Sequence, residues 1–138
     1  MNYAQLIPLA MKYGRQIGPK ALKAWATVAP LVEKNPQLRK FSDQMSSRLA
    51  AHRSGSGIAA QIEIAKEFAR DALTEQVIAE RQDLARRWAQ KAKGLEMQLR
   101  VADAGPAKAV KARRADVRNQ VDTLLMEIIE TVTKWADN

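Results

Sequence analysis

The placement of proline constrains the fold of this chain more than any other feature of its sequence. Pro8, Pro19, Pro30 and Pro36 divide the first third, whereas proline does not occur again until Pro106. Proline is tolerated in the first turn of a helix and breaks helix interiors. The pattern therefore predicts three or four short helices up to about residue 51, followed by longer ones.

The next segment, residues 58–102, contains no proline and is rich in strong helix formers such as Ala, Glu, Lys and Leu. Its large apolar residues recur at eleven-residue intervals, a spacing that favours a straight helix over a left-handed coiled coil. The recurring positions are Ile62, Leu73, Leu84 and Leu95, together with Val77, Trp88 and Leu99. We therefore expect one helix of roughly 65 Å, in which Gly94 is the candidate position for a break.

Gly105 and Pro106 end this helix and begin the last one, which is expected to reach about residue 136. A short loop folds the last helix back antiparallel, so residues 58–138 are expected to form a long hairpin with its tip near residues 103–106. The short helices of residues 1–53 are expected to pack on this hairpin, with residues 54–57 as a Ser/Gly linker. The predicted fold is an all-α helical bundle that forms one folding unit.

The last helix also carries a wide apolar stripe that should contact more than one neighbour. A hairpin seldom buries such a stripe alone, so part of it is expected to form the interface of a homodimer. The residues predicted for this interface are Leu125, Ile129 and Val132.

Catalysis and cofactor chemistry find little support in the composition. The chain has no cysteine and one histidine, His52, which excludes disulfides, thiolate sites and any metal site that needs two histidines. The carboxylate pairs Glu63/Glu67 and Glu127/Glu130 have helical spacing but lack the Glu-x-x-His companion of di-metal sites. We therefore predict a protein that is not an enzyme and has no cofactor, no metal and no small-molecule substrate.

One short stretch matches a nucleotide-binding pattern by its letters. Residues 55–60 read Gly-Ser-Gly-Ile-Ala-Ala, as in the phosphate-binding fingerprint of dinucleotide-binding domains. That fingerprint requires a preceding strand, whereas the preceding residues 45–51 have a helical pattern. The stretch is therefore interpreted as a flexible joint, with His52 as a solvated loop residue beside it.

The sequence lacks an apolar run of the roughly 20 residues that a bilayer requires, and it lacks the order of a signal peptide. A cytoplasmic location is therefore expected. Residues 2–25 mix apolar and basic side chains, so their association with an anionic membrane surface remains open.

The net charge of +8 is distributed in alternating blocks. Residues 1–53 and residues 86–118 each carry a net charge of +7, whereas residues 54–85 and residues 119–138 each carry −3. In a hairpin, the two acidic blocks meet at the base, where they can receive the basic N-terminal helices. The basic block at the tip has no acidic block to neutralise it.

The basic tip is therefore the candidate binding site for an anionic partner. Its residues are Arg86, Arg87, Lys91, Lys93, Arg100, Lys108, Lys111, Arg113, Arg114 and Arg118. Nucleic acid is the leading partner, bound with low sequence specificity, because the few aromatic residues include Trp88 and Trp135 on apolar stripes rather than on a stacking surface. Two alternatives stay open: an adaptor for proteins or membrane surfaces that self-associates, and a basic face that serves only solvation.

Overall fold

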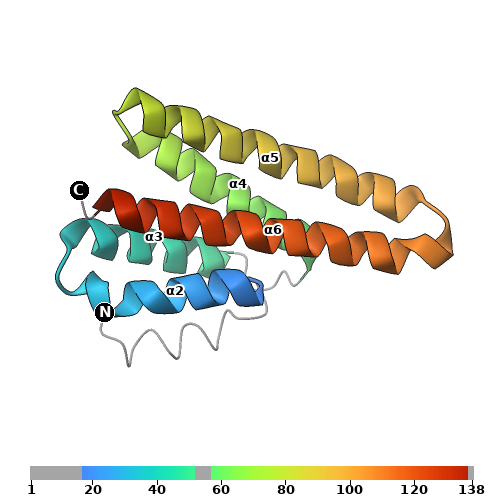
Figure 1. The fold of residues 1–138 in the computed structure, drawn as a ribbon, viewed down its shortest axis with the longest axis horizontal. Helices are drawn as coiled ribbons and strands as arrows, with labels where there is room; N and C mark the ends of the chain where they lie inside the picture. The colour runs from blue at the N-terminus through green and yellow to red at the C-terminus, as the bar shows by residue number, and fades with distance from the viewer. Residues whose placement is uncertain (1–16, 52–56, 137–138) are drawn as a thin grey trace.

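A computed structural model describes residues 17–51 and 57–136, and within them it contains five helices and no strand (Figure 1). The helices are α2 (Pro19–Val32), α3 (Pro36–Ala51), α4 (Ile58–Glu75), α5 (Ala79–Ala104) and α6 (Ala107–Ala136). They pack together around one shared apolar core. The predicted all-α helical bundle is therefore confirmed.

Several expectations concern residues outside the described ranges. These are the membrane-surface role of residues 2–16, the position of His52 and most of the linker at residues 54–56. The last linker residue, Gly57, is described and has φ +145°, a backbone conformation that favours glycine. It directly precedes α4.

Proline begins both short N-terminal helices of the described residues, as its placement predicts, but Pro30 lies inside α2 and does not divide it, contrary to the expectation. Pro19 occupies the first turn of α2, and Pro36 is the first residue of α3. The side chain of Asn35 caps α3, because its Oδ1 accepts hydrogen bonds from the backbone N–H groups of Gln37 at 2.9 Å and Leu38 at 3.4 Å. A local cap and a proline therefore set the start of α3.

The single helix predicted over residues 58–102 is wrong. The chain reverses at Gln76–Ile78, and α4 and α5 run antiparallel against each other (Figure 1). Gln76 and Ile78 have extended backbone angles, and Val77 in the turn is 90% exposed. When the chain reverses, the broad apolar face of α4 is buried against α5. The free energy gained by this burial is larger than the small helix propensity that residues 76–78 lose by leaving the helix. Gly94, the predicted break, lies inside an uninterrupted α5.

Alanine explains why the eleven-residue pattern misled the prediction. The buried residues of α5 are spaced alternately by three and four positions, which is the spacing of coiled-coil seams. They are Ala85, Trp88, Ala92, Leu95, Leu99 and Ala102. Half of this seam is alanine, so a pattern read from large apolar residues alone misses it.

The last helix, α6, packs against α2, α4 and α5, and its apolar stripe is covered within one chain. Leu125 and Ile129 are fully buried, and Val132 is partly buried against the same core. The prediction that Leu125 and Ile129 form an oligomer interface is therefore corrected, because the folded monomer buries both, whereas for the partly buried Val132 it stays a prediction. The prediction assumed a bare hairpin, whereas α2 and α4 supply the cover.

A buried carboxylate on α6 holds the start of α2. The Oδ2 and Oδ1 atoms of Asp122 accept hydrogen bonds from the backbone N–H groups of Lys20 at 3.0 Å and Ala21 at 2.9 Å. Gly18 packs directly on this carboxylate, since a Cβ built there would lie 2.2 Å from the Asp122 Cγ. The first turn of α2 therefore receives its N-terminal cap from another helix.

Candidate functional site

The candidate site lies where the ends of α5 and α6 project past the other helices (Figure 1). Gly105 and Pro106 join the two helices, and Gly105 N–H donates to the carbonyl of Ala102 at 3.2 Å. We call residues 86–118 the tip segment; it contains all ten cations predicted as the binding site. Along α5, these residues extend over about 27 Å.

Three of the ten cations have a carboxylate partner. Arg86 pairs with Asp83 at 2.7 Å, Arg100 with Glu96 at 3.1 Å, and Arg114 with Asp103 at 2.6 Å. Among the described residues, the other seven are exposed and make no ion pair. These seven, which we call the unpaired cations, are Arg87, Lys91, Lys93, Lys108, Lys111, Arg113 and Arg118.

The acidic residues of the tip segment are already engaged. Glu96 accepts hydrogen bonds from Arg100 and from Lys66, which reaches across from α4. Asp116 accepts a hydrogen bond from Gln120 Nε2 at 3.0 Å, and Asp103 is held by Arg114. Because these carboxylates face other partners, they leave the unpaired cations available to an external anion.

The Lys66–Glu96 contact also changes two ionisation equilibria. The hydrogen bond from Lys66 lowers the pKa of the Glu96 carboxyl from its ordinary value. The same hydrogen bond raises the pKa of Lys66, although burial opposes the shift. Both shifts favour the charged pair, which connects α4 to α5 where the tip segment begins to project.

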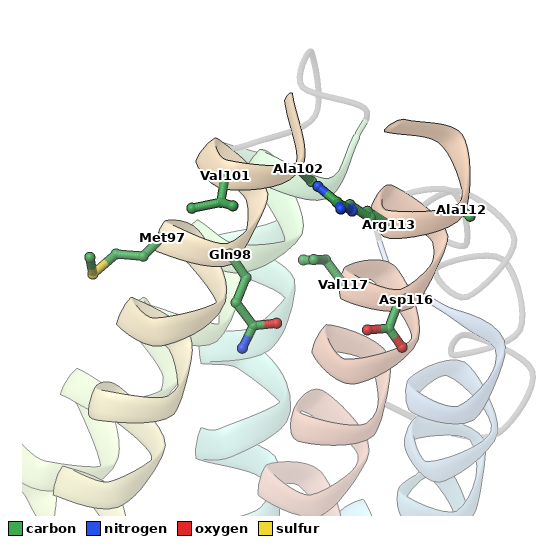
Figure 2. A pocket seen from close by; sticks show the side chains of 8 residues that line it. All are labelled: Met97, Gln98, Val101, Ala102, Ala112, Arg113, Asp116 and Val117. Atoms are coloured by element: carbon green, nitrogen blue, oxygen red, sulfur yellow. The ribbon is translucent and has the colours of Figure 1, made fainter. Parts of the chain in front are cut away.

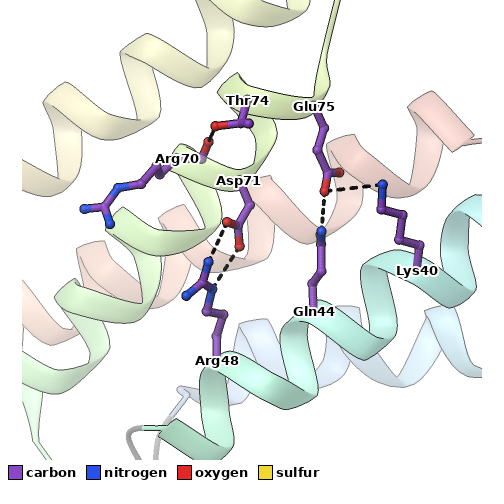
Figure 3. Close-up of polar contacts among 7 residues, drawn as sticks. All are labelled: Lys40, Gln44, Arg48, Arg70, Asp71, Thr74 and Glu75. Carbon is purple, nitrogen blue, oxygen red and sulfur yellow. Dashed lines mark hydrogen bonds and ion pairs between the residues drawn. The ribbon is translucent and has the colours of Figure 1, made fainter.

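The base of the bundle uses its charges differently (Figure 3). Arg48 of α3 forms a two-point contact with Asp71 of α4, at 3.1 Å and 2.8 Å, and the pKa of Arg48 is raised by this hydrogen bonding. Lys40 lies 3.8 Å from Glu75, which also accepts a hydrogen bond from Gln44. The expected pairing of basic N-terminal helices with acidic residues of 54–85 is therefore present between α3 and α4.

An open groove of about 600 Å³ lies beside the tip between α5 and α6 (Figure 2). Eight residues from the two helices line it: Met97, Gln98, Val101 and Ala102 from α5, and Ala112, Arg113, Asp116 and Val117 from α6. Met97 is 62% exposed and Val101 is 65% exposed, and the two lie next to each other in the lining of this groove. The sequence pattern does not indicate this groove, because neither the charge distribution nor the periodicity of the seam reports apolar residues outside the seam.

Arg113 connects the charged and apolar features of the tip. Its side chain extends from α6 toward the end of α5 (Figure 2), and a Cβ built on Gly105 would lie 2.8 Å from its Nη1. The guanidinium therefore lies near the C-terminal end of α5, where the helix dipole favours a cation.

The aromatic residues of the described chain serve packing, as predicted for both tryptophans. Trp88 is buried, and its ring stacks on Trp135 with centroids 5.5 Å apart. Arg81 lies over the Trp135 ring, 5.2 Å from its centroid. These rings are therefore unavailable as a platform for stacking bases.

Within residues 17–51 and 57–136, no three His, Cys, Asp or Glu side chains gather as they would to bind a metal ion. In the same ranges, no helix is long and apolar enough to cross a bilayer. Comparison of the chain with protein-family models, curated proteins and solved structures found no match.

Proposed function

We propose that this chain is a non-enzymatic binding protein whose tip segment contacts the phosphate backbone of nucleic acid. The observation that carries the proposal is the set of unpaired cations exposed along the tip segment of α5 and α6. Cations without a carboxylate partner can each neutralise a phosphate and release a bound counterion, which is the main source of non-specific affinity for nucleic acid.

The proposed binding has low sequence specificity. Reading bases by stacking requires exposed aromatic rings, whereas Trp25, Phe68 and Trp88 are buried. Contacts made by Lys and Arg to phosphates position a duplex without distinguishing its sequence.

The test compares two triple variants that change the net charge equally. Lys108→Gln, Lys111→Gln and Arg118→Gln remove three unpaired cations from the tip segment. Binding of a fluorescent DNA duplex is measured by anisotropy between about 50 and 200 mM salt, where phosphate contacts have their steepest effect. We expect at least tenfold weaker binding, and a slope of log affinity against log salt that is smaller by about 3.

The matched control removes three exposed cations from α2, α3 and the loop between them, through Lys23→Gln, Lys34→Gln and Arg39→Gln. This variant should bind DNA as the original chain does. Equal loss in both variants would show that net charge alone drives binding, and absence of binding by the original chain would refute the proposal. Arg114 is left unchanged in both, because it is paired with Asp103.

A protein–protein adaptor is the second candidate function. The observation that favours it is the apolar groove with Met97 and Val101 exposed beside the unpaired cations. Phosphate binding does not require such a groove. Homodimerisation stays a prediction, and it would have to use residues other than the buried Leu125 and Ile129.

A further inference from the structure

The tip groove presents an apolar surface that the fold does not use. Met97 and Val101 are one helical turn apart on the same face of α5, and both are exposed. The seam beneath them is already closed, since Leu99, Ala102 and Val117 are buried between the helices. Met97 and Val101 are therefore not needed for packing α5 against α6.

The ends of this surface carry positive charge. Arg113 lines the groove beside the end of α5, and Lys91 lines a smaller depression further along the same two helices, with Gln120 and Thr123. Neither cation has an ion-pair partner among the described residues. Lys91 and Val101 are separated by about 15 Å along α5, which is the length of three helical turns.

We propose that this groove docks an amphipathic helix of a partner protein, one that carries acidic residues at the two ends of an apolar stripe. The apolar stripe covers Met97 and Val101, while the acidic residues pair with Arg113 and Lys91. A helix laid in a groove between two helices is a common mode of peptide recognition, and it reads anchors spaced by three and four residues.

Charge complementarity favours this occupant over two others that the protein itself could supply, a second copy of the chain and residues 1–16. A second copy that presents the same groove would bring two cations, Arg113 and Lys91, and only one carboxylate, Asp116, against the same set. Residues 1–16 contain Lys12 and Arg15 and no acidic residue, so this segment lacks the required charges. The docking site uses Met97 and Val101, and it therefore does not rest on nucleic-acid binding.

The experiment uses two synthetic helices of about 14 residues, both with leucine at positions i, i+3, i+4 and i+7. One has glutamate at each end, and the other has lysine in its place. Binding of each labelled helix to the full chain is measured by fluorescence anisotropy. We expect the glutamate helix to bind at least tenfold more tightly than the lysine helix; absence of binding, or equal binding of both, overturns the proposal.

Paired variants locate the binding. Met97→Gln with Val101→Thr should weaken binding of the glutamate helix about tenfold, and both sites are exposed, so the fold should persist. The matched control, Leu31→Gln with Val77→Thr, changes two exposed apolar residues outside the groove and should leave binding unchanged. Equal effects of the two double variants overturn the proposal.

Three further measurements on the groove variant distinguish other occupants. Loss of DNA affinity would assign the groove to nucleic acid, and loss of binding to phosphatidylcholine/phosphatidylglycerol vesicles would assign it to a membrane surface. A shift from dimer to monomer in sedimentation would assign it to a second copy. Each of these results overturns the helix proposal, whereas unchanged DNA binding with lost helix binding supports it.

Discussion

The base and the tip of the bundle show how the same kind of side chain can serve different purposes. At the base, Arg48 and Lys40 of α3 are matched by Asp71 and Glu75 of α4. Along the tip segment, seven exposed cations have no such partner within the described residues. The two basic blocks have equal net charge in the sequence, so the difference comes from which helix lies opposite.

The apolar side chains follow the same division. Trp88, in the first turn of the tip segment and farthest from Gly105, is buried and stacks on Trp135, whereas Met97 and Val101, near Gly105, are exposed. The buried part of the bundle therefore carries most of the stability of the fold, and the end near Gly105 carries surface that folding does not require. The following predictions test this division, from the largest expected effect to the smallest.

The largest effect is expected from removing the buried ring of Trp88. Trp88→Ala should lower the free energy of unfolding by about 3–5 kcal/mol, because it leaves a cavity beside Trp135. Met97→Ala at the tip should change it by less than about 0.5 kcal/mol. Chemical denaturation of both variants measures the difference, and similar losses would show that the tip is part of the stabilising core.

A smaller but substantial effect is expected at the cap of α2. Asp122→Ala removes the acceptor of two backbone N–H groups and should cost about 2 kcal/mol. Gly18→Ala should also destabilise the protein, because the new Cβ would collide with the Asp122 carboxylate.

The control for this cap is Asp116→Ala, an exposed carboxylate of the tip on the same helix. Asp116→Ala should leave the midpoint of thermal unfolding, followed by circular dichroism, nearly unchanged. A neutral Asp122→Ala would mean that water replaces the cap at no cost, and the anchoring role of α6 would then be wrong.

The paired charges at the base should contribute modestly to stability. Arg48→Ala should cost about 0.5 kcal/mol at low salt, since the contact is partly exposed and screened by solvent. Arg87→Ala should cost nothing measurable. The difference between the two variants in free energy of unfolding, measured by chemical denaturation, should shrink as salt is added. A difference that persists at high salt would point to lost packing rather than lost charge.

The smallest effect concerns pH and the Lys66–Glu96 contact. Because Lys66 lowers the pKa of Glu96, the pair stabilises the fold above the ordinary carboxyl pKa, and this contribution is lost as pH falls through the lowered value. Because the pKa of Lys66 is raised, the contribution is lost again as pH rises through that value. The stabilised range therefore lies between the two shifted pKa values.

This prediction is measured by carboxyl NMR titration. Lys66→Met should move the Glu96 pKa upward toward its ordinary value, whereas Lys91→Met, on the groove side of α5, should leave it in place. An unchanged pKa in the first variant would show that the other neighbours of Glu96, such as Arg100, hold the carboxylate charged without Lys66.

The sequence predicts those parts of the fold that depend on local signals. Asn35 and Pro36 set the start of α3, and Gly105 with Pro106 sets the tip, because caps and breakers act on neighbouring residues. The turn at Gln76–Ile78 has no glycine or proline, so it depends on α4 packing on α5 and was missed. The Asp122 cap was missed for the same reason, since donor and acceptor belong to different helices.

The candidate site also has a part that the sequence predicts and a part that depends on distant residues. All ten cations can be listed from the sequence, but their pairing depends on distant residues, such as Asp103 for Arg114. The exposure of Met97 and Val101 depends on how the other helices are placed around the tip, which helix periodicity does not report.

The cap that α6 provides for α2 also orders events during synthesis. The hydrogen-bonded residues are 101 and 102 positions apart, so α2 leaves the ribosome long before Asp122 is made. At about 5–20 residues per second, this delay is about 5–20 s. Until then the first turn of α2 has no capping carboxylate, and truncation of the chain before residue 122 should leave α2 undocked. The bundle therefore closes only when its last helix is translated, whereas the tip forms from residues that are made one after the other.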